Sequence, residues 1–385
     1  MLLRQKIDWP LIGLGVALAA IVLLGWPRTA AMPLDQGAST PAVEKPLITA
    51  TADYNAPALA GTTLTKLAAG AGPVSIVRDP SDLPAAVGNR GPRRVKVDLE
   101  TIEVTGKLND GATYRYWTFN GKVPGPFVRV RVGDIVEVHL KNRVDSAMVH
   151  NVDFHAVLGP GGGAKATEAA PGDTRGFEFK AVHPGLFVYH CAVMPAAWHI
   201  SSGMYGMILV EPEGGLPKVD HEFYVMQGEI YTEAKFGAQG EQKPSYDKLL
   251  NEQPEYYTFN GAVGALTTEK PLHSKVGDTI RIFFGVGGPN HDSSFHVIGQ
   301  VFDHVYVMGS LTSPAATDVQ TVTVPPGGAV VVDLKTLVPG KYLLVDHSLS
   351  RVERGLAGVL QVEGAPNLAL FKDYDPQRSA SVTSH

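Results

Sequence analysis

The predicted fold depends most on one stretch near the middle of the chain, Phe187-Val188-Tyr189-His190-Cys191-Ala192-Val193-Met194-Pro195-Ala196-Ala197-Trp198-His199-Ile200-Ser201-Ser202-Gly203-Met204. The segment from Leu186 to Cys191 is predicted to be a β-strand, in which successive side chains point to opposite faces. Cys191 is the only cysteine among the 385 residues, so it cannot form an intramolecular disulfide. It must therefore be an inert core thiol, a nucleophile or a metal ligand.

Donors of the kind that bind copper accompany Cys191. His199 and Met204 follow it within the same stretch, and His150 supplies a second imidazole upstream. Thiolate and thioether sulfurs suit copper, which imidazole also binds. A lone buried cysteine is usually only a small apolar residue. Four soft or borderline donors in this order nevertheless favour a copper site.

The position of His190 beside Cys191 indicates a second metal. Two neighbours on a strand face opposite ways and cannot easily bind one ion. If Cys191 faces a copper inside its domain, His190 faces a different ion outside it. Because consecutive Cα atoms are about 3.8 Å apart, the two ions would lie about 10 Å apart and be joined by covalent bonds.

Composition and charge limit the class of protein. The length allows two to three domains, and 44% of the residues are hydrophobic, which is ordinary for a chain with a real core. The net charge of -5, with both signs mixed, argues against nucleic acid as a partner.

The N-terminus predicts export of the protein. Arg4 and Lys6 precede an uncharged run from Trp9 to Trp26, which is typical of a signal peptide or a membrane anchor. The length of the run favours an uncleaved anchor, and either segment places the body in the periplasm or elsewhere outside the cytoplasmic membrane. We assign residues 1–31 to this segment and residues 32–92, rich in Ala, Thr, Pro and Gly, to a flexible tether.

From Val95 onward, apolar residues recur at every second position and turn residues separate the runs, which predicts an all-β sandwich. The pattern repeats, because residues 117–121 recur as 257–261 and residues 132–134 as 276–278. We therefore predict two tandem sandwiches over 93–212 and 213–364, followed by a tail over 365–385.

The second copy has no cysteine, yet it keeps His296 and has His347, which suggests a task outside its own core. Gly161-Gly162-Gly163 resembles a phosphate-binding loop only superficially, since no Lys-Ser/Thr follows it.

The chain from about Arg93 to Gly364 resembles the copper-containing nitrite reductases of the two-domain cupredoxin type. The resemblance rests on six motifs: Thr118-Phe119-Asn120-Gly121, His150-Asn151-Val152-Asp153-Phe154-His155, Tyr189-His190-Cys191, Gly203-Met204-Tyr205-Gly206, Ser293-Ser294-Phe295-His296-Val297-Ile298-Gly299 and Leu344-Val345-Asp346-His347. It implies two tandem cupredoxin-like Greek-key sandwiches. The ligand loop around 194–198 and the segment 348–354 depart from the family's usual pattern.

The resemblance also implies the site residues. One type 1 copper and one type 2 copper are expected per subunit. The ligands implied for type 1 copper are His150, Cys191, His199 and Met204, and those for type 2 copper are His155, His190 and His347. Asp153 and His296 match the family's catalytic acid pair. In that family the type 2 copper lies between subunits of a homotrimer, so His347 and His296 would come from a neighbouring chain.

The implied activity is the dissimilatory reduction of nitrite to nitric oxide in denitrification, with one electron arriving through Cys191-His190 and two protons. The expected electron donor is a small cupredoxin or a cytochrome c. Met194, Pro195 and Trp198 could form an apolar docking patch for it or could simply pack around the copper.

Two alternatives belong to other classes. A non-enzymatic cupredoxin for electron transfer or copper binding would leave His155, His190 and His347 without a role. A multicopper oxidase would need several His-x-His pairs, and the sequence contains none. A fused haem domain is excluded because Cys-x-x-Cys-His requires two cysteines.

Overall fold

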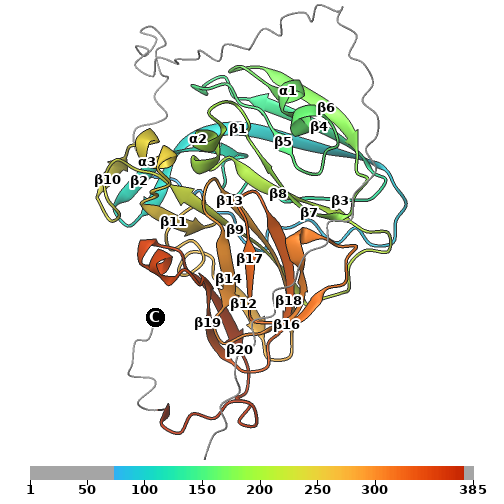
Figure 1. Ribbon diagram of the computed structural model, residues 1–385, viewed down its shortest axis with the longest axis vertical. Coiled ribbons are helices and arrows are strands. Elements are labelled where there is room, and N and C mark those ends of the chain that lie inside the picture. Colours follow the sequence, from blue (N-terminus) through green and yellow to red (C-terminus); the bar gives the residue numbers. More distant parts are fainter. Residues whose placement is uncertain (1–72, 377–385) are drawn as a thin grey trace, which may run out of the picture. The chain divides into compact units, whose positions relative to one another are not determined.

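The computed structural model describes residues 73–376, whose strands form four β-sheets (Figure 1). In the first sandwich, one sheet is ordered β10 (Gly240–Gln242), β2 (Ala112–Phe119), β1 (Arg94–Asn109), β4 (Ile135–Asn142) and β6 (Thr174–Lys180). The facing sheet is ordered β3 (Val128–Arg131), β8 (Tyr205–Glu211), β7 (Gly185–His190) and β5 (Asp153–Phe154).

The second sandwich also has two sheets. Six strands follow the order β11 (Tyr256–Phe259), β9 (His221–Ile230), β13 (Thr279–Gly288), β18 (Ala329–Lys335), β15 (Phe302–Tyr306) and β16 (Ala316–Val319). Five more follow the order β12 (Leu272–Lys275), β20 (Gly358–Glu363), β19 (Gly340–Asp346), β14 (Ser293–Val297) and β17 (Thr321–Val324).

The strand pairings of the first sandwich recur in the second. β1 pairs in parallel with β4 as β9 does with β13, and β3 pairs in parallel with β8 as β12 does with β20. β7 pairs antiparallel with β8 as β19 does with β20. The prediction of an all-β fold with two tandem cupredoxin-like sandwiches is confirmed.

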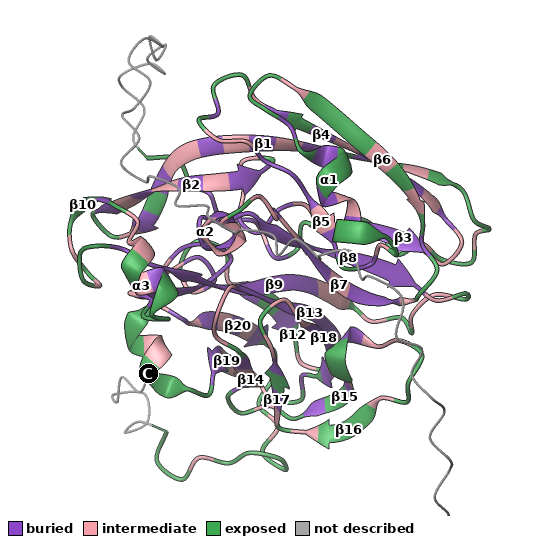
Figure 2. Cartoon of the chain, turned by 45° about the horizontal axis from the view of Figure 1, so that its top comes forward, coloured by how far each residue is buried: buried purple, intermediate pink, exposed green. Residues whose placement is uncertain are grey.

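The period-two pattern of β4 explains why this segment is a strand. Val136, Val138 and Leu140 are fully buried, whereas Glu137 and Lys141 alternate with them on the outer side. A strand with one apolar face must cover that face against a second sheet. The buried faces of both sandwiches stand out in Figure 2.

Strand β7 lies between two apolar cores. Leu186 and Val188 belong to the large core that extends into the second sandwich. Tyr189 and Cys191 belong to the core of the first sandwich. The alternation expected for this strand is therefore present up to its C-terminal end.

Helical segments within residues 73–376 are short. They are η1 (Pro160–Gly163), α1 (Ala164–Thr167), α2 (Ala196–Ser201), α3 (Tyr246–Leu250), η2 (Val307–Gly309) and η3 (Leu349–Arg354). None of the helices between residues 73 and 376 has the length and apolar character needed to cross a membrane. The predicted signal peptide or anchor lies outside the described residues.

Two segments pack where the sequence pattern did not place them. Ile76 and Val77, within the predicted tether, are buried, and residue 77 bridges to Val123. Strand β10 comes after the predicted boundary at residue 212, but it pairs with β2 of the first sandwich. Short contacts of this kind carry no periodicity from which they could be predicted.

A buried ionic cluster joins the two sandwiches. Arg129 of β3 donates to Glu211 of β8 and, at 2.6 and 3.1 Å, to both carboxylate oxygens of Glu222 of β9. The side chains of Arg129 and Glu211 are each 1% exposed. A buried charge that loses its partner is costly to keep in the folded state.

We predict that Arg129→Met lowers the free energy of unfolding by about 3–5 kcal/mol, because Glu211 would then be buried without a counter-charge. Urea unfolding of the copper-free protein, followed by circular dichroism, measures this loss. Arg94→Met is the control, since Arg94 and Glu178 form an ion pair on the surface. Equal midpoints for the two variants would contradict the assignment.

Candidate metal centres

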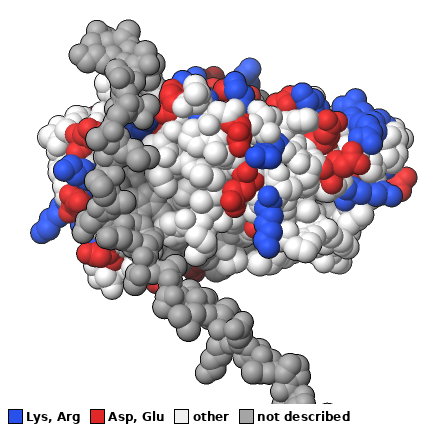
Figure 3. All heavy atoms as spheres, turned by 90° about the horizontal axis from the view of Figure 1, so that it is seen from above, with Lys and Arg blue, Asp and Glu red and all other residues white. Residues whose placement is uncertain are grey.

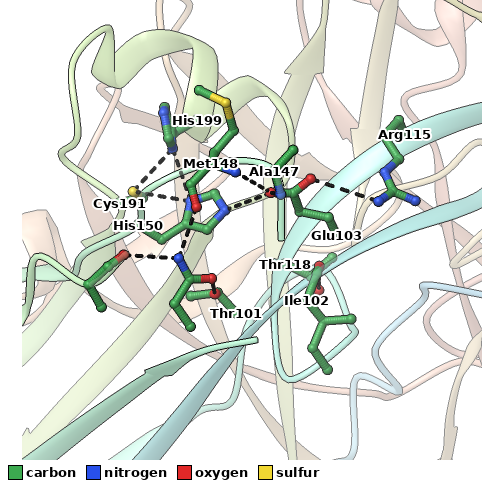
Figure 4. Close-up of polar contacts among 12 residues, drawn as sticks. Thr101, Ile102, Glu103, Arg115, Thr118, Ala147, Met148, His150, Cys191 and His199 are labelled. Atoms are coloured by element: carbon green, nitrogen blue, oxygen red, sulfur yellow. Dashed lines mark hydrogen bonds and ion pairs between the residues drawn. The ribbon is translucent and has the colours of Figure 1, made fainter. Parts of the chain in front are cut away.

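His150, Cys191 and His199 converge inside the first sandwich, and all three are fully buried (Figure 4). Cys191 Sγ lies 3.3 Å from His199 Nδ1 and 4.0 Å from His150 Nδ1. The two Nδ1 atoms are 3.2 Å apart. Three donor atoms thus surround one small volume, as the ligands of a metal ion do.

Glu103, which the sequence analysis did not single out, fixes the orientation of His150. Its Oε1 lies 3.2 Å from His150 Nε2 and accepts the backbone N–H groups of Ala147 and Met148 (Figure 4). Because a carboxylate only accepts, His150 carries its proton on Nε2 and directs the Nδ1 lone pair towards Cys191. The alternation along β1 places Glu103, a charged residue, on the buried face of the strand. This pattern is the signal in the sequence that could have identified Glu103.

Burial shifts the pKa values of two side chains in this cluster. Burial raises the pKa of Cys191 to about 11, although the backbone N–H groups of Asn151 and Val193 partly oppose the shift. Burial and the neighbouring His150 lower the pKa of His199 to about 3. His199 Nε2 is buried without a hydrogen-bond partner among the described residues. The neutral imidazole of His199, beside a thiol and a second imidazole, fits a soft metal such as copper.

Met204 belongs to the same cluster of buried residues as Cys191. Its backbone N–H donates to the carbonyl of His199 (3.2 Å), and its carbonyl accepts from the N–H of Cys191 (3.1 Å). Helix α2 and the turn after it therefore bring these three residues together. Trp117 closes one side, with its ring 4.7 Å from the ring of His199.

A second group of donors lies at the ends of β5 and β7. Ligand atoms of Asp153, His155 and His190 lie within 4.8 Å of one another, and the Nε2 atoms of the two histidines are 3.0 Å apart. Strand pairing sets Asp153 opposite His190. Partial burial and His190 lower the pKa of His155, while Asp153 opposes the shift. Two neutral imidazoles beside a carboxylate can bind a metal ion.

One peptide links the two groups. His190 Nδ1 lies 3.0 Å from the carbonyl oxygen of Cys191, to which it donates, so its Nε2 lone pair faces His155. His190 and Cys191 take part in different donor groups, as neighbours on a strand should.

His296 and His347 meet in the second sandwich, with ring centroids 5.6 Å apart. They line a pocket of about 340 Å³ together with Ser294, Gln320, Thr321 and Ser348. His296 Nδ1 donates to the carbonyl of Gln320 at 2.6 Å, which leaves Nε2 available. Within residues 73–376 of one chain, His347 does not join His155 and His190 in a common group of ligand atoms.

Asp346 shapes the turn that presents His347. Its fully buried carboxylate accepts the N–H groups of Ser294 and Ser348 and pairs with Arg351 of η3. Segment 348–354 thus contributes a cation, Arg351, that helps to hold the turn around His347.

Comparisons with known protein families and sequences match this chain to copper proteins. Two models of the multicopper oxidase family match residues 100–215 and 239–365. A copper-containing nitrite reductase of Neisseria meningitidis is 54% identical over 287 residues, which are 74% of this chain and 74% of that relative. One from Alcaligenes faecalis is 35% identical over 301 residues, covering 73% of this chain and 79% of that relative.

The solved structures that resemble this chain include a copper nitrite reductase. The copper nitrite reductase of Nitrosomonas europaea superposes with a TM-score of 0.64 at 34% sequence identity, and the match covers 71% of this chain and 95% of that one. The similarity of sequence and structure thus spans both sandwiches.

We predict that Glu103→Gln weakens Cu(II) binding at the buried cluster by about 10–100-fold, because the carboxylate that orients His150 is lost. Competition with a chelator, followed by the visible absorption of thiolate-bound Cu(II), measures this affinity. Glu100→Gln is the control, since Glu100 lies on the same strand and pairs with Lys141 at the surface. Unchanged affinity in Glu103→Gln would remove Glu103 from the site.

Proposed function

The chain belongs to the copper-containing nitrite reductase family and is an oxidoreductase, and from this premise we propose how its residues reduce nitrite to nitric oxide. The observation that carries the proposal is that Cys191 and His190, neighbours in sequence, belong to two different donor groups. An electron accepted at one group needs to cross only the covalent bonds between these residues to reach the other.

His150, Cys191, His199 and Met204 are the proposed ligands of the type 1 copper. His155 and His190, with His347 of the partner subunit, are the proposed ligands of the type 2 copper. Copper held by these residues would supply the one-electron chemistry that nitrite reduction needs.

Asp153 is the proposed first proton donor. Its carboxylate lies beside His155 and His190, where an oxyanion bound at the proposed type 2 site would be within its reach. Conversion of nitrite to nitric oxide consumes two protons and releases water, so one of the nitrite oxygens must be protonated. A carboxyl group in hydrogen-bond contact with that oxygen can supply a proton directly.

His296 is the proposed second acid. Donation from its Nδ1 to Gln320 orients the ring and leaves Nε2 to hold the second proton. Its ring contact with His347 keeps it beside the proposed ligand.

A homotrimer completes the proposed site. In one chain, His347 stands apart from His155 and His190, which leaves each set of imidazoles short of a ligand. A second copy can bring the pocket of His296 and His347 against the ends of β5 and β7. Cyclic association of identical chains places the same pair of surfaces at every interface.

A small cupredoxin or cytochrome c is the proposed electron donor. Met194, beside the type 1 ligand loop, is 82% exposed, and the ring of Trp198 lies 5.3 Å from that of Tyr246 on α3. An exposed apolar group over a buried redox site suits transient docking. On the face in Figure 3, acidic and basic side chains are interspersed.

The proposed location is the periplasm or another space outside the cytoplasmic membrane. The uncharged run from Trp9 to Trp26 after two basic residues supports it, as a signal peptide or as an anchor. The alternatives of a copper carrier or a multicopper oxidase are not favoured by the nitrite reductase relatives.

We predict that the copper-loaded protein produces nitric oxide from nitrite and an artificial reductant, and that Asp153→Asn lowers the rate about 10²–10⁴-fold with copper content unchanged. The amide cannot supply the proton, yet it preserves the shape of the carboxylate. A nitric oxide electrode and metal analysis measure the two quantities.

Asp173→Asn is the control for this experiment, because Asp173 pairs with Arg175 at the surface. Full activity of Asp153→Asn would exclude Asp153 as the acid. Absence of nitric oxide from the wild-type protein would overturn the proposed reaction.

We predict that His155→Ala and His347→Ala are each inactive alone and recover activity when the two chains assemble together. If the site lies between subunits of a trimer, one of the three interfaces in every mixed trimer combines an intact His155 with an intact His347. Differently tagged chains, co-expressed and purified through both tags, provide the mixed oligomers. Mixed oligomers without nitrite reduction would place His347 in another role.

A further inference from the structure

Gly161-Gly162-Gly163, which has no role in the function proposed above, lies over the side chain of Asp153. A Cβ atom at residue 162 would be 1.8 Å from Oδ1 and 2.8 Å from Cγ of Asp153, so the carboxylate occupies the space that a side chain would need. Gly162 is buried. Resting on the proposed function of Asp153 as the acid, we propose that Gly162 is a positioning residue that sets the direction of this carboxylate towards the nitrite site.

Contact with Gly162 restrains the Asp153 side chain. Among residues 73–376, no hydrogen bond to a protein group holds this carboxylate, and the side chain is only half-buried. The backbone at Gly162 therefore limits the rotamers that the Asp153 side chain can adopt. The rotamer present keeps a carboxylate oxygen within 4.8 Å of the ligand nitrogens of His155 and His190.

The glycine wall is tied to the strand that carries Asp153. Thr167, fully buried in α1, accepts the N–H of Val152 at 3.0 Å and donates its hydroxyl to the carbonyl of Gly163 at 2.9 Å. One hydroxyl thus bonds the residue before Asp153 and the residue after Gly162. The hydroxyl therefore holds the glycine segment in place relative to the backbone of strand β5, which carries Asp153.

The wall cannot withdraw to make room, because its other side is also packed. A Cβ at Gly163 would meet Cζ of Phe177, on β6, at 2.2 Å. On the near side, the carbonyl oxygen of Phe154 would be 3.0 Å from a Cβ at Gly162. An added methyl group must therefore move the end of the Asp153 side chain, the most mobile of its neighbours.

The test compares alanine at two neighbouring glycines. Gly161 and Gly162 have φ values of +67° and +54°, so alanine strains the backbone similarly at both. A Cβ at Gly161 meets only Cβ of Ala164, at 3.9 Å. The two variants differ in whether the new methyl group collides with Asp153.

We expect Gly162→Ala to lower kcat for nitrite about 10²-fold, since displacing a reacting group by about 1 Å has costs of that size. Copper content and the visible spectrum of the thiolate site should stay as in the wild type. Gly161→Ala should keep wild-type kcat and should lose less thermal stability than Gly162→Ala, because its methyl group meets only Cβ of Ala164. Equal kcat in the two variants would overturn the proposal.

A second pair of variants tests the collision without using activity. With Asp153→Ala as the background, the carboxylate is gone and the carbonyl oxygen of Phe154 remains, so the extra loss of melting temperature caused by Gly162→Ala, compared with Gly161→Ala, should become smaller. The part of this extra loss that appears only in the wild-type background comes from the carboxylate. A full additional loss in both backgrounds would mean that the methyl group collides elsewhere, and would overturn the proposal even if Gly162→Ala alone failed to fold.

The outcomes separate this inference from the proposed function. Full activity in Asp153→Asn defeats the catalytic role of Asp153, while the melting temperatures still report the collision. Loss of activity in Asp153→Asn, with wild-type kcat in Gly162→Ala, upholds the acid and removes Gly162 from its positioning.

Discussion

The alternation of side chains along β7 is the constraint on which both donor groups depend. A strand exposes successive residues to opposite faces, and β7 has a closed apolar core on one face of Cys191 and an open edge at His190. The thiol of Cys191 is thereby buried, while the imidazole of the preceding residue, His190, stays partly exposed. The fold separates two chemical environments without separating the residues in sequence.

Each environment is completed by polar groups that lie far away in sequence. Glu103 of β1 orients His150, and Asp346, held by Arg351, shapes the turn before His347. Such partners matter because an acceptor for the other ring N–H fixes the tautomer and the orientation of an imidazole that binds a metal. The ligand geometry therefore depends on residues that contribute no ligand atom.

The sequence predicted the parts of the fold that carry a period. Val136, Val138 and Leu140 alternate with polar residues over a whole strand, and the recurrence of 117–121 as 257–261 predicted the second sandwich. It did not predict strand β10 or the buried Ile76, since both make short, isolated contacts with the first sandwich. Contacts between distant segments depend on tertiary packing, which local patterns do not encode.

The candidate site also has one part that the sequence predicted and one part that it did not. The convergence of His150, Cys191 and His199 was predicted from residue type and spacing, and the chain brings these three together. The role inferred for Gly162 depends on a distance between η1 and strand β5, and a run of three glycines alone equally suggests a phosphate loop. Backbone shape at a site becomes visible only when its neighbour is known. Here that neighbour is a carboxylate, for which a residue without a side chain leaves room.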